Sequence, residues 1–118
     1  MLTAVSVGCN QLASTPAPEA PDPTYQSVIA NYFKTTFKTY ASYKAFEIST
    51  PRWVHGFQGW NWLICVRFLD GDCRRTYVLT LNGTNIVDAH YAVQTDDCGA
   101  QAYSVFEQLG GAGLEPLH

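Results

Sequence analysis

An alternating stretch in the middle of the chain limits most strongly what it can fold into. From Trp60 to Leu69 apolar side chains recur at every second position, and the pair Asp70-Gly71 follows directly. Such alternation is typical of a half-buried strand, and an Asp-Gly pair favours a two-residue hairpin turn. The sequence therefore predicts an antiparallel hairpin here, with Phe68 opposite Cys73.

The strand after the next turn, at Asn82-Gly83, allows two registers that differ by one residue. With a two-residue loop the core-facing residues would be Ile86, Asp88 and His90. With a three-residue loop that includes Thr84 they would be Val87, Ala89, Tyr91 and Val93. We expect the second register, because it places apolar side chains beside apolar ones. Residues 43–49, which also alternate, complete a predicted sheet of four strands.

Two helices are predicted at the ends of this sheet. The first has Asp22 as its cap and Pro23 at its first position. Its apolar residues recur at three- and four-residue spacing, namely Tyr25, Val28, Ile29, Tyr32, Phe33, Phe37 and Tyr40. The second runs from about Cys98 to Leu109, with a cap at Asp96 or Asp97 and a stop at Gly110-Gly111. Its expected inward residues are Ala102, Val105, Phe106 and Leu109.

These elements predict an α+β fold for residues 23–118, which would form a single domain. A long N-terminal helix would pack on a four-stranded antiparallel meander sheet, and a short C-terminal helix would follow. This αββββα order resembles the cystatin-like arrangement, in which a sheet wraps around a helix. Only the order of the elements supports that resemblance.

Charge and composition exclude several classes of function. A net charge of -3 and a pI near 5.4 leave no broad basic surface, so no nucleic-acid partner is expected. No cysteine pair has the spacing of zinc ligands, and the histidines are scattered at positions 55, 90 and 118. We therefore expect neither a metal nor a cofactor.

The N-terminal segment points to a location. An apolar run over residues 1–8 ends at Cys9, and residues 9–22 are rich in proline and alanine. The sequence LTAVSVGC, residues 2–9, resembles the lipobox of bacterial lipoproteins, in which small residues precede a cysteine that becomes diacylated. The resemblance implies that residues 1–8 are the remnant of a signal segment, that Cys9 carries the lipid, and that residues 9–22 are a tether. Asn10 in place of Asp after the cysteine implies the periplasmic face of the outer membrane.

The remaining cysteines predict a disulfide in that oxidising compartment. In the expected register Cys73 lies beside Val93, only a few residues before Cys98. Cys65 points to the opposite face of the sheet and lies further along. We therefore predict a Cys73–Cys98 disulfide.

The segment from Pro51 to Trp62 is rich in aromatic residues and glycines, a composition typical of contact loops. Strand parity assigns Trp60 and Trp62 to the core. Trp53, His55 and Phe57 then remain as candidate partner-binding residues. The opposite face of the sheet is mixed in polarity, so it could be covered by the C-terminal helix or by a second copy in a homodimer.

The sequence favours a small cell-envelope lipoprotein that is not an enzyme and binds another envelope protein or a ligand. One alternative is a periplasmic inhibitor of a hydrolase, either a protease or lysozyme, and another is a structural part of an envelope assembly. A thiol enzyme that uses Cys65 with His90 is disfavoured, because nothing in the sequence orients the base or supplies oxyanion donors.

Overall fold

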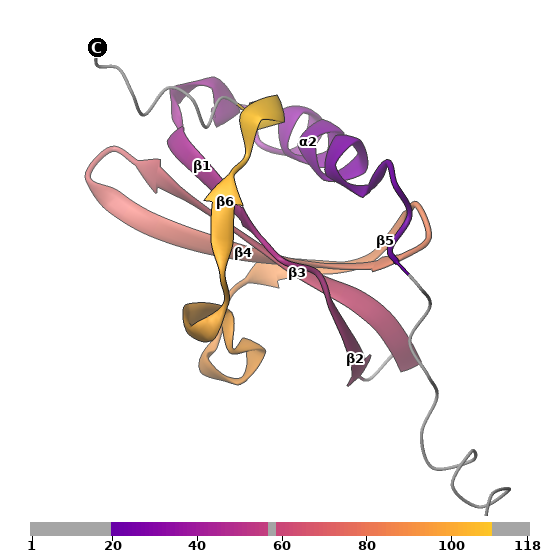
Figure 1. Ribbon diagram of the computed structural model, residues 1–118. Helices are drawn as coiled ribbons and strands as arrows, with labels where there is room; N and C mark the ends of the chain where they lie inside the picture. The colour runs from indigo at the N-terminus through magenta and orange to yellow at the C-terminus, as the bar shows by residue number, and fades with distance from the viewer. Residues whose placement is uncertain (1–19, 57–58, 110–118) are drawn as a thin grey trace, which may run out of the picture.

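The computed structural model describes residues 20–56 and 59–109. Its centre is a six-stranded antiparallel sheet with the order β5-β4-β3-β1-β6, and β2 also pairs with β3 (Figure 1). The strands are β1 (Lys44–Ser49), β2 (Arg52–Gly56), β3 (Gly59–Asp70), β4 (Cys73–Asn82), β5 (Asn85–Tyr91) and β6 (Tyr103–Val105). The helix α2 (Tyr25–Thr36) lies across one face, which we call the front face. Short 3-10 turns are η1 (Tyr40–Ser42), η2 (Gln94–Asp96), η3 (Cys98–Ala100) and η4 (Glu107–Leu109).

The helix α2 is shorter than the aromatic stripe predicts. It begins at Tyr25 with Thr24 as its N-cap, so the cap expected at Asp22 and the start expected at Pro23 are two residues too early. The Asp22 carboxylate instead accepts hydrogen bonds from the backbone and hydroxyl of Thr24 at 2.8 and 2.6 Å. It ends at Thr36, where two β-branched threonines weaken the helix. Phe37 is already extended, so the stripe continues through an irregular segment and η1 instead of a fourth helical turn.

The main core lies between α2 and the front face of the sheet. Ile29, Ala30 and Phe33 of α2 are buried. They pack in one cluster with front-face residues that include Phe46, Ile48, Ile64, Val66, Phe68, Leu79 and Leu81. The Phe33 ring touches the rings of Phe46, Phe68 and Tyr77 at centroid distances of 5.7–5.9 Å. This aromatic contact fixes α2 on the sheet.

One side of the long strand β3 is shared by two shorter strands. β1 pairs with the second half of β3, and β2 pairs with its beginning, from Arg52 opposite Leu63 to Gly56 opposite Gly59. Where the two strands meet, the Ser49 hydroxyl accepts a hydrogen bond from the Cys65 backbone at 2.8 Å. The segment that the sequence left as a loop is therefore largely a strand.

The β3–β4 hairpin exists, but its register differs by two residues from the prediction. Asp70 lies opposite Cys73, so Gly71-Asp72 forms the turn and Phe68 lies opposite Arg75. A shift of two keeps every side chain on its predicted face. Arg75 then lies close to the turn of the hairpin, where its guanidinium pairs with the Asp70 carboxylate at 3.0 Å.

The β4–β5 hairpin has neither predicted loop, but its two halves turn the same side chains to the core as the two predicted registers. Near its Gly83-Thr84 turn Leu81 lies opposite Ile86, and Ile86 packs against the core. A register irregularity follows, after which Leu79 lies opposite Ala89 and Tyr77 opposite Tyr91. Such a bulge exchanges the two faces of a strand, so the expected core position of Ala89 is confirmed. The expected loop is wrong, and Tyr91 and Val93, which were also expected in the core, are 48% and 57% exposed.

The predicted C-terminal helix is wrong. Residues 98–109 form η3, the strand β6 and η4, and β6 pairs with β1. Phe106 and Leu109 are buried as expected, whereas Val105 is 47% exposed and Ala102 is also exposed. Tyr103, Ser104 and Val105 have weak helix propensity, and Gly99 weakens the helix further. The stop expected at Gly110-Gly111 lies outside the described residues.

A second, smaller core lies on the rear face of the sheet, opposite α2. Cys65, Val78 and Cys98 are buried there, with Leu63, Ala92 and Tyr103 packed beside them. Residues 92–102, which we call the rear loop, fold beneath the sheet before β6 returns along β1 (Figure 1). The rear loop, and not a C-terminal helix, covers this part of the rear face.

The expected fold of a long helix, a four-stranded sheet and a C-terminal helix is therefore wrong. The chain forms a six-stranded sheet with one α-helix among residues 20–56 and 59–109, and the cystatin-like order does not apply to it. No helix in these residues is long and apolar enough to cross a membrane.

Candidate functional site

Four aromatic side chains form a ridge on the front face of the β2–β3 hairpin. Trp53 lies opposite Trp62, and His55 lies opposite Trp60, so all four share one face. The ring centroids are 5.1 Å apart for Trp53 and Trp62, 6.1 Å for Trp53 and Trp60, and 5.0 Å for His55 and Trp60. We call Trp53, His55, Trp60 and Trp62 the aromatic ridge.

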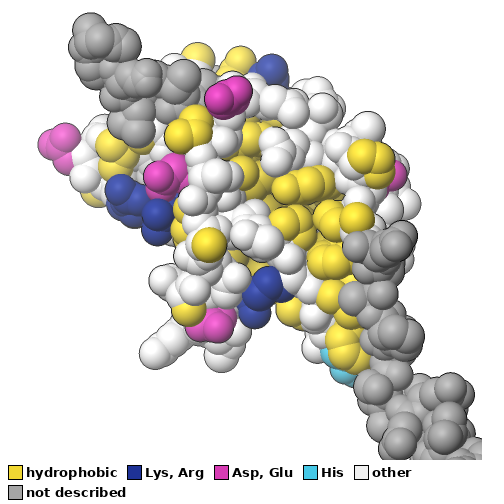
Figure 2. All heavy atoms as spheres, viewed as in Figure 1, with side chains coloured by type: hydrophobic (Ala, Val, Ile, Leu, Met, Phe, Trp, Pro, Cys, Tyr) yellow, Lys and Arg dark blue, Asp and Glu magenta, His cyan; other side chains and the backbone are white. Residues whose placement is uncertain are grey.

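The aromatic ridge extends beyond the part of the sheet that α2 covers, although Trp62 still packs against the main core. The β2–β3 hairpin projects away from the helix in Figure 1, and the three tryptophans are only partly buried while His55 is exposed. Figure 2 shows hydrophobic side chains gathered on this face and running toward that end of the sheet. The ridge is thus apolar surface that the described part of the fold leaves accessible.

A shallow apolar depression continues the ridge past Trp62. It measures about 550 Å³. Its lining residues are Ala20, Pro21, Pro23, Tyr25, Thr50, Pro51 and Trp62. The ridge and the depression together offer aromatic and proline rings. Such rings bury a large apolar area when a partner binds and lose little conformational entropy.

The predicted contact residues are brought together only in part. Trp53 and His55 lie side by side on the ridge, whereas Phe57 lies outside the described residues. Sequence reasoning placed Trp60 and Trp62 in the core and missed their share in the ridge. The available signal was the Gly56 and Gly59 pair, which closes a hairpin of alternating aromatic residues.

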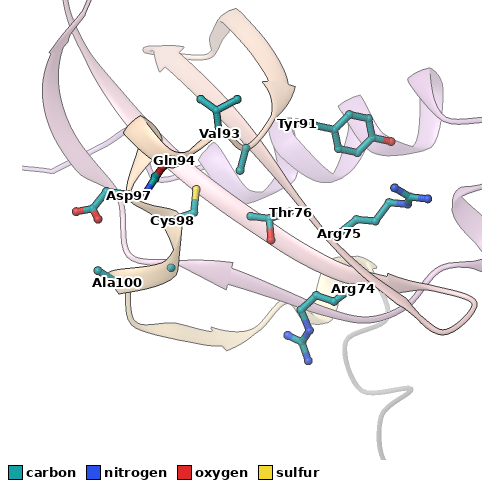
Figure 3. Close-up of a pocket in the computed structure, with 11 residues that line it drawn as sticks. Arg74, Arg75, Thr76, Tyr91, Val93, Gln94, Asp97, Cys98 and Ala100 are labelled. Atoms are coloured by element: carbon teal, nitrogen blue, oxygen red, sulfur yellow. The ribbon is translucent and has the colours of Figure 1, made fainter.

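An open groove of about 610 Å³ lies where β5 ends, at Tyr91 (Figure 3). Its lining residues include Arg74, Arg75, Tyr91, Val93 and Cys98. Arg74 and Arg75 are neighbours on β4 and point to opposite faces of that strand (Figure 3). Both guanidinium groups already have acidic neighbours, because Arg74 lies 3.7 Å from Glu47 and Arg75 lies 3.0 Å from Asp70. Arg74 shares the Glu47 carboxylate with Arg67, which lies 2.7 Å from it, but Asp97 adds a further acidic group to the groove, so the groove offers little uncompensated charge to an anionic ligand.

A pocket of about 260 Å³ opens on the rear face. Its lining includes Asn61, Thr80 and a cluster of Asp88, His90 and Asp96. His90 Nδ1 lies 2.7 Å from the Asp88 carboxylate, and Nε2 lies 2.9 Å from the Asp96 carboxylate. Partial burial lowers the pKa of His90, but the hydrogen bonds and charges of Asp96 and Asp88 outweigh it and raise the pKa above its ordinary value.

The cysteines are arranged differently from the prediction. Cys98 is bonded to Cys65, and Cys73 is an exposed free cysteine, so the Cys73–Cys98 pair is wrong. Because Cys65 is in a disulfide, it has no thiol with which His90 could form a nucleophile. Among residues 20–56 and 59–109 no three His, Cys, Asp or Glu side chains are placed to hold a metal ion.

No protein-family model, curated protein or solved structure matches this chain. Cys9, the predicted site of lipidation, lies outside the described residues.

Proposed function

We propose that this protein is a non-enzymatic binding module of the bacterial cell envelope, anchored through a lipid on Cys9, and that the aromatic ridge contacts its partner protein. The ridge carries the proposal. Three tryptophans and a histidine on one accessible strand face provide a large, rigid apolar surface, and tryptophan is enriched among the residues that dominate protein interfaces.

The proposed binding role predicts that one substitution on the ridge weakens the affinity for the partner. Trp53 lies between Trp60 and Trp62, so Trp53→Ala should remove the centre of the surface and weaken partner affinity at least about tenfold, as for interface hot spots. The partner would first be identified by photo-crosslinking from position 55 in intact cells. The affinity of the purified pair would then be measured by calorimetry.

Val105→Ala is the matched control for this measurement. Val105 is also a large apolar residue, 47% exposed, but it lies on β6, far along the sheet from β2. It should leave the affinity unchanged. Equal affinities of the wild type and Trp53→Ala, with both proteins folded by circular dichroism, would contradict a role for the ridge.

The anchor predicts a specific mass. Protein extracted from bacterial membranes should begin at Cys9 and carry a diacylglyceryl group, because two acyl chains give stable membrane attachment where one would be marginal. Intact-mass spectrometry measures this, and Cys9→Ser should release the protein into the soluble fraction. An unprocessed amino end on soluble wild-type protein would contradict the lipoprotein assignment.

A further inference from the structure

We infer that Asp88, His90 and Asp96 form a proton-dependent clasp that holds the rear loop on the sheet. The clasp joins two elements. Asp88 and His90 belong to β5, and Asp96 ends η2 within the rear loop. The His90–Asp96 contact therefore connects the sheet to the segment that carries Cys98 over the second core.

The geometry requires a charged imidazole. Both ring nitrogens lie within 2.9 Å of a carboxylate oxygen, and an ionised carboxylate only accepts hydrogen bonds. A neutral histidine has one N–H, so its other nitrogen would direct a lone pair at a carboxylate. Only the imidazolium donates to both, and the two contacts are then charge-assisted.

Apart from Asp88 and Asp96, the residues that line the pocket around His90 carry no charge. Across the pocket lie Val54 of β2, Asn61 and Leu63 of β3, and Thr80 of β4. From β2, Arg52 donates a hydrogen bond of 2.6 Å to the backbone carbonyl of Asp96. That contact does not depend on histidine, so the rear loop keeps one attachment when the clasp opens.

The Asp96 carboxylate also organises the loop itself. The oxygen that contacts His90 accepts a hydrogen bond from the Val93 backbone at 2.9 Å, where the chain leaves β5 and enters η2. Loss of the histidine contact therefore acts on the first turn of the rear loop. The disulfide holds Cys98 in place, so the expected motion is a local opening of residues 93–97.

The direction of the pH dependence follows from the sign of the shift. Because the folded-state pKa of His90 is raised, its contribution is fully present below the ordinary pKa of histidine, about 6.5, and is lost as the pH rises through the raised value. The rear loop should therefore be held most tightly in mild acid and loosen in alkaline solution.

Amide hydrogen exchange on the full chain tests the clasp. The backbone amides of Asp96 and Asp97 donate hydrogen bonds to the carbonyls of Val93 and Gln94, so they report the opening of residues 93–97. Between pH 5 and pH 8.5 their protection factors, corrected for intrinsic exchange, should fall about tenfold relative to the β3 and β4 amides, the effect of a partly exposed charged hydrogen bond. In His90→Gln this difference should vanish.

Asp88→Asn is the matched control. It removes the same charge as Asp96→Asn, but its contact with His90 lies within β5 and does not reach the rear loop. At pH 5 Asp88→Asn should keep the loop protected, and Asp96→Asn should not. Rear-loop protection that is independent of pH in the wild type would overturn the clasp. So would a decline shared equally by all amides, or a decline that persists in His90→Gln.

Discussion

Replacing Phe33 with alanine should lower the free energy of unfolding by about 3–5 kcal/mol, the usual cost of emptying a core phenylalanine site. Phe33 is completely buried, and its ring contacts three further rings on β1, β3 and β4. Those strands are held by hydrogen-bonded neighbours, so they cannot move in to fill the cavity. Urea unfolding followed by circular dichroism measures the loss.

Lys34→Ala is the natural control, because Lys34 lies on the same helix and is exposed. It should change stability by no more than about 0.5 kcal/mol. Phe33→Leu, which keeps much of the apolar volume, should fall between the two. A Phe33→Ala protein as stable as Lys34→Ala would mean that α2 does not pack on the sheet as described.

The strands were the most predictable part of the fold, because alternation over β3 and β4 is strong and a shift of two residues leaves the faces unchanged. Register was less predictable. The turn at Asp70-Gly71 closed one residue later than an Asp-Gly pair suggests, and the irregularity between β4 and β5 has no signature in composition. A bulge is decided by which side chains the finished core accepts, and that information is not local.

The C-terminal helix failed for a related reason. The spacing of Phe106 and Leu109 suits a helix, and both residues are buried as that spacing predicts. The preceding residues Tyr103, Ser104 and Val105 instead pair with β1. Backbone hydrogen bonds to the edge of β1 therefore stabilise this segment more than a helix of weak propensity would. A periodic pattern of a few residues cannot distinguish these outcomes when the partner strand is distant in the sequence.

The candidate site was predictable in its composition and not in its arrangement. Trp53 and His55 were identified from an aromatic cluster, but their alignment with Trp60 and Trp62 depends on a hairpin closed between Gly56 and Gly59. The contact between His90 and Asp96 was not predictable at all. Asp96 resembles a helix cap in sequence, and only the path of the rear loop brings it to His90.

Removal of the Cys65–Cys98 disulfide is the second change for which a large effect is expected. The bond closes a loop with a sequence separation of 33, and a loop-entropy estimate gives a loss of about 3–4 kcal/mol in the double variant Cys65→Ala/Cys98→Ala. Both cysteines are also buried in the second core, so the substitution removes packing under the rear loop as well. Urea unfolding under oxidising conditions measures the difference.

Cys73→Ser separates this arrangement from the pairing that the sequence suggested. That pairing assumed that Cys73 lies beside Val93, but the Ala92 backbone bonds to Thr76, so the chain turns beneath the sheet three residues before it would reach Cys73. Because Cys73 is exposed and free, Cys73→Ser should change stability by no more than about 0.5 kcal/mol. If Cys73→Ser were as damaging as the loss of Cys98, the Cys73–Cys98 bond would have to exist, and the rear loop could not cover the second core.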